Sequence, residues 1–66
     1  MNFKQSMISY LSEKGRNVNW VAKKLDVSVQ TIYLKERPSI NFIRQFCDLL
    51  NCYIITDGKT FTILDK

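Results

Sequence analysis

The sequence predicts a mainly α-helical domain that ends in a β-hairpin. Apolar residues recur at helical spacing in four segments of the first fifty residues, and each segment follows an Asn or Ser that can cap a helix. The remaining tail is rich in β-branched and aromatic residues around an Asp-Gly pair. A chain of 66 residues can bury one small core, so we expect one domain over residues 1–66.

The first helix is expected over about residues 3–14. Its apolar residues are Phe3, Met7, Ile8 and Leu11. Asn2 followed by Gln5 forms a capping-box pattern at the start of the helix. Gly15 suits the left-handed conformation that often follows the last helical turn. Both ends of this helix are therefore marked in the sequence.

Two short helices are expected next, over about residues 18–25 and 29–36. Asn17 and Ser28 are the expected N-caps. The apolar residues of the first are Val18, Val21, Ala22 and Leu25, and Ile32 is the best core candidate of the second. Only about three residues separate the two helices, which is the spacing that a helix-turn-helix motif requires.

A fourth helix is expected over about residues 40–50. Pro38 interrupts the preceding helical pattern, and Ser39 can cap the new helix. Its predicted apolar stripe is Ile40, Ile43, Phe46, Cys47 and Leu50. Asn51 can adopt the left-handed backbone conformation that often ends a helix.

A β-hairpin is expected over about residues 53–64. Asp57 and Gly58 are a strong signal for a two-residue hairpin turn. Such a turn predicts two pairs on the inner face, Ile54 with Phe61 and Cys52 with Ile63. The residues predicted on the outer face are Tyr53, Ile55, Thr60, Thr62 and Leu64.

Composition excludes several classes of protein. Ten Lys and Arg against six Asp and Glu give a net charge of +4, which favours a polyanionic partner such as nucleic acid. Without histidine and without a Cys-x-x-Cys pair, we expect no metal site, no cofactor and no enzymatic activity. The sequence shows neither a long apolar run nor a signal-peptide pattern, so the expected location is the cytoplasm, with no membrane partner and no small-molecule ligand.

The segment from Asn17 to Asn51 reads NVNWVAKKLDVSVQTIYLKERPSINFIRQFCDLLN. It resembles the Cro/repressor family of helix-turn-helix proteins. Ala22 stands where the family keeps a small residue at the crossing of two helices. Other matching positions are Leu25, Val27, Ser28, Ile32, Glu36, Pro38, Ser39, Ile43, Phe46, Cys47 and Leu50. The resemblance implies a lambda-repressor-like four-helix domain that binds DNA.

Two residues of the segment depart from the family pattern. Asp26 occupies the place where the family prefers glycine at a left-handed turn, a conformation that aspartate tolerates at modest cost. Val18 stands where a glutamine often contacts phosphate. The loop before the fourth helix is also shorter than usual.

The third helix carries the expected base contacts, since the second helix of a helix-turn-helix enters the major groove. These residues are Ser28, Val29, Gln30, Thr31 and Tyr33. Gln30 can make paired hydrogen bonds to adenine, and Val29 can contact a thymine methyl group. Three of these side chains have a plainer alternative, which is solvent exposure for Gln30, packing on the core or on a partner for Val29, and a half-buried place in the core for Tyr33.

Polar and basic side chains around this helix are the expected phosphate contacts. They are Asn17, Asn19, Lys23, Lys24, Lys35 and Arg37, with Arg16 and Arg44 as further candidates. The alternative is an ordinary solvated face. Trp20 is expected mainly to pack against the core, and the two cysteines are expected to be reduced, packed thiols.

The outer face of the hairpin is the expected dimer interface, over Tyr53, Ile55, Thr60, Thr62 and Leu64. Phage Cro proteins similarly use C-terminal strands to dimerise. The alternative is a hairpin that only completes the core of a monomer.

Two functions follow as hypotheses. The first is a Cro-like transcriptional repressor that binds an inverted repeat in double-stranded DNA as a homodimer. The second is a protein-binding module on the same fold, such as an antirepressor, an antitoxin or an anti-CRISPR-like inhibitor. The apolar residues Val29, Tyr33 and Leu34 keep the second hypothesis open.

Overall fold

The computed structural model describes residues 2–34 and 38–66. Its elements in chain order are α1 (Phe3–Glu13), α2 (Val18–Leu25), α3 (Val29–Tyr33), α4 (Ile40–Leu50), β1 (Cys52–Thr56) and β2 (Phe61–Asp65). The prediction of a mainly α-helical domain with a C-terminal β-hairpin is therefore confirmed. The last predicted residues of the third helix, up to 36, lie outside the described residues.

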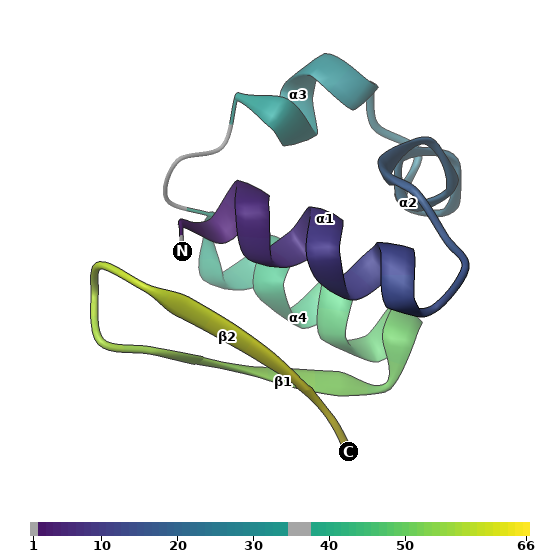
Figure 1. Cartoon of the computed structure of the whole chain (residues 1–66). Helices are drawn as coiled ribbons and strands as arrows, with labels where there is room; N and C mark the ends of the chain where they lie inside the picture. Colours follow the sequence, from purple (N-terminus) through teal and green to yellow (C-terminus); the bar gives the residue numbers. More distant parts are fainter. Residues whose placement is uncertain (1, 35–37) are drawn as a thin grey trace.

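The elements form three levels (Figure 1). α1 and α4 lie in the middle, the hairpin packs against one side of them, and α2 and α3 lie on the opposite side. Within the hairpin, β2 contacts α1 and β1 contacts α4. The surface of α3 and the outer face of the hairpin therefore point to opposite sides of the molecule.

All four predicted N-caps are confirmed. In each case the cap side chain accepts a hydrogen bond from a backbone N–H three residues further on: Asn2 from Gln5, Asn17 from Trp20, Ser28 from Thr31, and Ser39 from Phe42. The Gln5 side chain also accepts from the backbone of Asn2, which completes the capping box. Each cap stabilises its helix by typically about 1 kcal/mol, which matters in a domain this small.

The core lies where the three levels meet. The Phe3 ring makes edge contacts with three other rings, Phe42 at 5.9 Å, Phe46 at 6.2 Å and Phe61 at 5.6 Å between centroids. Other buried side chains are Met7, Tyr10, Leu11, Val18, Val21, Ala22, Ile32 and Cys52. Aromatic rings at these separations stabilise a core beyond their buried area, so Phe3 joins both middle helices to the hairpin.

The predicted apolar stripe of α4 is partly wrong. Ile40 is 71% exposed, whereas Phe42, which the prediction omitted, is buried. Phe42 and Phe46 lie one helical turn apart, so both rings reach Phe3. Burying two large aromatic rings outweighs burying Ile40, and α4 is rotated accordingly.

The hairpin has the predicted inner face but a different register. Ile54 lies opposite Ile63, and Cys52 lies opposite Asp65, so the predicted pairs with Phe61 and Ile63 are wrong by two residues. A shift of two residues keeps every side chain on its expected face.

The reason for this shift is the hairpin loop, which spans residues 57–60. The Asp57 carboxylate accepts hydrogen bonds from the backbone N–H groups of Lys59 and Thr60, both at 2.8 Å. The Thr56 hydroxyl accepts from the Gly58 N–H and donates to the Thr60 carbonyl. These bonds stabilise a four-residue loop in place of the predicted two-residue turn.

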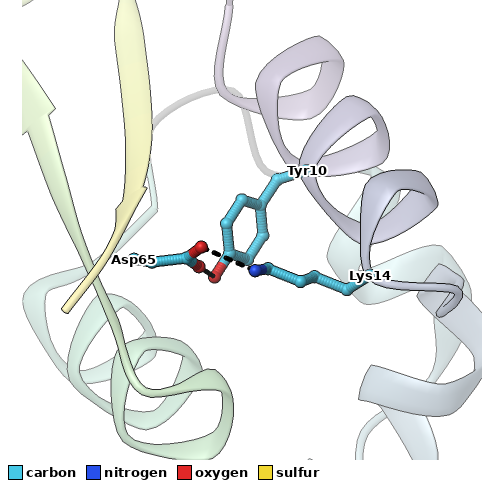
Figure 2. Close-up of polar contacts among 3 residues, drawn as sticks. All are labelled: Tyr10, Lys14 and Asp65. Atoms are coloured by element: carbon cyan, nitrogen blue, oxygen red, sulfur yellow. Dashed lines mark hydrogen bonds and ion pairs between the residues drawn. The ribbon is translucent and has the colours of Figure 1, made fainter.

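Two side chains of α1, together with Lys14 at its C-cap, hold β2 against the middle level. The Ser6 hydroxyl donates to the Phe61 carbonyl at 2.5 Å, and the Tyr10 hydroxyl donates to the Asp65 carboxylate at 2.6 Å. Lys14 forms an ion pair with the second Asp65 oxygen at 2.6 Å (Figure 2).

Within residues 2–34 and 38–66, each helix is too short or too polar to cross a bilayer.

Candidate nucleic-acid interface

α2 and α3 are joined by a tight turn over residues 26–28. Asp26 has φ 56° and ψ 47°, the left-handed conformation expected from its place in the sequence. The Val27 N–H then donates to the Ala22 carbonyl at 3.0 Å, and the Asp26 N–H donates to the Lys23 carbonyl. This bonding pattern satisfies the carbonyls at the end of α2 and turns the chain sharply into α3.

The packing of α3 depends on Ile32, which is fully buried. α3 packs against α2, where Ala22 is also buried. A small side chain such as Ala22 lets two helices approach closely. Since Ile32 is the buried residue of α3, the other faces of this helix remain available to a partner.

Four of the five predicted base-contact residues are exposed, namely Ser28, Gln30, Thr31 and Tyr33. Val29 is half-buried and packs against the core, which agrees with the alternative stated for it. The hydroxyls of Ser28 and Thr31 lie 2.6 Å apart and bond to each other, while Ser28 also caps the helix. Gln30 makes no hydrogen bond through its side chain within the described part of the chain, so its amide is free to bind.

Tyr33 has a neighbour that the sequence did not reveal. The ammonium group of Lys4 lies 5.0 Å from the centroid of the Tyr33 ring. Lys4 lies in the first turn of α1 and Tyr33 ends α3, so only the fold brings them together, and no sequence pattern links them. This cation–π contact holds a positive charge next to the exposed surface of α3.

Trp20 carries two cations on its ring. The Arg16 guanidinium lies 4.8 Å and the Lys24 ammonium 5.9 Å from the ring centroid. Trp20 is half-buried and packs against the core, as expected. Among the described residues the ion pair found is that of Lys14 with Asp65, so no described carboxylate forms an ion pair with Arg16 or Lys24.

The remaining predicted phosphate contacts divide into two groups. The first group is exposed on or next to α2, close in sequence to Trp20 and the two cations at its ring, and consists of Asn17, Asn19 and Lys23. The Asn17 side-chain oxygen caps α2, which leaves its amide NH₂ group as a possible donor. Lys35 and Arg37 lie outside the described residues.

The predicted dimer residues lie on the outer face of the hairpin, with one exception. Tyr53 pairs with Leu64 and Ile55 pairs with Thr62, so these four uncharged side chains form one patch. All four are exposed. Thr60 belongs to the loop and not to β2, because Asp57 holds its backbone N–H in the four-residue loop. Its place on the outer face was therefore a wrong prediction.

No protein-family model, no curated protein and no solved structure matches the chain. The arrangement consists of an exposed short helix, with a Gln30 amide that bonds to no other described residue, flanked by cations from α1 and α2. Such a surface can bind a polyanion and also present hydrogen-bonding groups to it.

Proposed function

We propose that the chain binds double-stranded DNA in a sequence-specific manner, with α2 and α3 acting as a helix-turn-helix. The observation that carries this proposal is the exposure of α3, which buries Ile32 and leaves Ser28, Gln30, Thr31 and Tyr33 open. A helix exposed in this way fits the major groove, where base edges show a readable pattern of donors and acceptors.

Gln30 is the principal base-reading residue of the proposal. Its amide offers both a donor and an acceptor, which matches the adjacent groups on the edge of adenine. Ser28 and Thr31 are held in fixed positions by their mutual bond, so little entropy is lost when their hydroxyls bind. Val29 offers its exposed portion to a thymine methyl group.

The cations around α3 fix its position on the phosphate backbone. Arg16 and Lys24 are held at the Trp20 ring, and Lys4 is held at Tyr33. Because these charges have no ion-pair partner among the described residues, DNA binding breaks no ion pair within that part of the chain. Such contacts set register without reading sequence.

We further propose that the protein works as a Cro-like repressor, in the cytoplasm, as a homodimer on an inverted repeat. The resemblance to the Cro/repressor family supports this role. One α3 presents few base contacts, and pairing two copies doubles them.

A binding titration with duplex DNA at several salt concentrations tests the DNA-binding proposal. With at least three phosphate contacts, log K is expected to fall by about 0.9 for each contact per unit of log salt. The variant Gln30→Ala is expected to keep this salt slope but to lose about 1–3 kcal/mol of discrimination at one base position. Absence of duplex binding at low salt would contradict the proposal.

A protein-binding module is the second candidate, and one observation favours it. Leu34 at the end of α3 is 80% exposed, and Tyr33 next to it is also exposed. Apolar side chains in such positions often anchor protein partners. Under this alternative, Leu34→Ala would abolish binding to a protein partner, and duplex binding would be weak and independent of sequence.

A further inference from the structure

A pocket of about 190 Å³ opens to solvent between α1 and β2. Residues 61–63 of β2 line one wall, and the other wall consists of the α1 side chains Ser6, Ser9, Tyr10 and Glu13. Successive side chains of a strand point to opposite faces of its sheet. A wall made of three consecutive residues therefore follows the edge of β2 and not either face.

The backbone groups that β2 directs toward this pocket can be deduced from the strand register. Lys66 donates its N–H to the Asn51 carbonyl at 3.2 Å, so this opposed pair is bonded across the strands. Bonded and non-bonded pairs alternate along an antiparallel ladder. Ile63 lies opposite Ile54, three positions further along, and this is a non-bonded pair. The N–H and carbonyl of Ile63 therefore point away from β1 and toward the pocket.

The edge of β2 is fastened on either side of Ile63 but open at Ile63 itself. The outward carbonyl of Phe61 accepts a hydrogen bond from the Ser6 hydroxyl. Beyond Ile63, the Asp65 side chain is held by Tyr10 and Lys14. Within residues 2–34 and 38–66, no hydrogen bond from a helix, loop or side chain reaches the Ile63 backbone. One donor and one acceptor of β2 are thus available side by side.

Glu13 is the charged side chain among the residues that line the pocket. It is exposed, and the ion pair found in the described part of the chain is that of Lys14 with Asp65, so Glu13 forms no ion pair there. In a chain of net charge +4, the Glu13 carboxylate is a local negative site. The pocket therefore favours a ligand that carries a cation.

We propose that this pocket binds a short extended segment of a partner protein, which adds to the edge of β2 and carries a Lys or Arg side chain. An antiparallel residue beside Ile63 exchanges two backbone hydrogen bonds with it, as when peptides add a strand to a sheet edge. Its side chain lies on the same face of the sheet as that of Ile63. Ile63 packs against the core, so the added cation is directed to the face that carries α1 and Glu13.

The extent of the open edge favours a short segment over β2 of a second copy. Pairing along the whole of β2 requires the Phe61 carbonyl, which Ser6 already occupies. Two-fold pairing centred on Ile63 would also place the Glu13 carboxylates of both copies beside one shared edge. Like charges that meet in this way destabilise strand pairing. A basic segment of another protein meets neither obstacle.

Binding at this pocket is compatible with the proposed DNA-binding function and goes beyond it. The hairpin and α3 lie on opposite sides of α1 and α4 (Figure 1), so a segment bound beside β2 leaves the surface of α3 uncovered. The chain could then contact duplex DNA and a protein partner at the same time.

An NMR titration of the full chain with the blocked tripeptide acetyl-Val-Lys-Val-amide tests the proposal. The Ile63 amide is expected to shift and to become protected from exchange with solvent. The Ile54 amide, which points outward on the opposite edge of the hairpin, should not change. The peptide acetyl-Val-Glu-Val-amide is expected to bind at least about threefold more weakly. An unchanged Ile63 amide or equal binding of the two peptides would overturn the proposal, as would an Ile63 amide already protected by a second copy in concentrated free protein.

Two matched pairs of variants locate the site. Glu13→Gln is expected to weaken binding of the lysine peptide by about threefold to fivefold, whereas Asp48→Asn removes the same charge from an exposed residue of α4 and should not. Ser9→Trp fills the pocket and is expected to abolish binding. Ser12→Trp makes the same change at an exposed residue of α1 outside the lining and should preserve it. Equal effects within either pair would overturn the placement. Duplex binding by Ser9→Trp reports on the DNA-binding function separately, since α3 is unchanged.

Discussion

The Tyr10 hydroxyl lies 2.6 Å from a carboxylate oxygen of Asp65, which fastens the last strand to the first helix (Figure 2). Lys14 holds the other oxygen at the same distance. The hydrogen bond from Lys14, followed by that from Tyr10, lowers the pKa of Asp65 below its ordinary value. Burial, followed by the bond to Asp65, raises the pKa of Tyr10. The ionised carboxylate and the neutral phenol are therefore the forms that the fold stabilises.

Acid is expected to weaken this attachment. The stability that comes from the lowered pKa of Asp65 is present above the unfolded value of about 3.9 and is lost as pH falls through the folded pKa. Urea unfolding at a series of pH values from about 5 down to about 2 measures the loss. Asp65→Asn is expected to lose less stability over this window. Parallel curves for the two proteins would contradict the role of Asp65.

Raising the pH into the alkaline range is expected to destabilise the fold through ionisation of the Cys52 thiol. Burial, and then the neighbouring Cys47, raises the pKa of the Cys52 thiol to about 11. The ordinary value is about 8.5, so the stability from this thiol is complete below about pH 8.5 and is lost as pH rises through 11.

The ¹³Cβ chemical shift of Cys52, followed by NMR against pH in the folded Cys47→Ala variant, isolates the titration of Cys52 from that of the tyrosines. Burial is the largest cause and is retained in this variant, so ionisation is expected well above about pH 8.5. In the same variant unfolded by urea, ionisation should return to the ordinary value. An ordinary titration in the folded protein would show that Cys52 is not enclosed as described.

The attachment of α3 depends on Ile32. Ile32→Val removes one methylene group from a fully buried site and is expected to lower the free energy of unfolding by about 0.5–1.5 kcal/mol. Leu34→Ala, in the same segment but 80% exposed, should change it by less than about 0.5 kcal/mol. Urea denaturation of both variants provides the comparison, and equal effects would contradict the packing of α3.

Asp26 combines a left-handed conformation with a negative charge between α2 and α3. Asn tolerates this conformation as well as Asp does, so Asp26→Asn should keep the fold and strengthen duplex binding by removing repulsion from phosphate. Asp26→Ala also removes the charge but should be destabilised by about 1 kcal/mol, since alanine disfavours positive φ. Weaker DNA binding by a stable Asp26→Asn variant would place Asp26 in a contact with DNA.

Local signals allowed much of the fold to be predicted. The four caps, the left-handed positions at Gly15 and Asp26, and the bounds of α2 and α4 all depend on residues close together in sequence. Such signals have a direct mechanism in backbone hydrogen bonding. They also sufficed to place the exposed residues of α3.

Features that depend on tertiary contacts were predicted less well. α4 is rotated so that Phe42 faces the core, because the Phe42 ring packs against the ring of Phe3, which is distant in sequence. The contact of Lys4 with Tyr33 has the same origin. The hairpin register was missed for a different reason, because the Asp57 carboxylate can support either a two-residue or a four-residue loop.

Selection of bound duplexes from a random pool tests the central claim most directly. If α3 reads bases and two copies bind together, the enriched sequences should form an inverted repeat whose half-sites are centred about one helical turn, or a multiple of it, apart. The Gln30→Ala variant should relax the preference at one symmetric position. A pool that remains random after selection at moderate salt would contradict sequence-specific DNA binding by this protein.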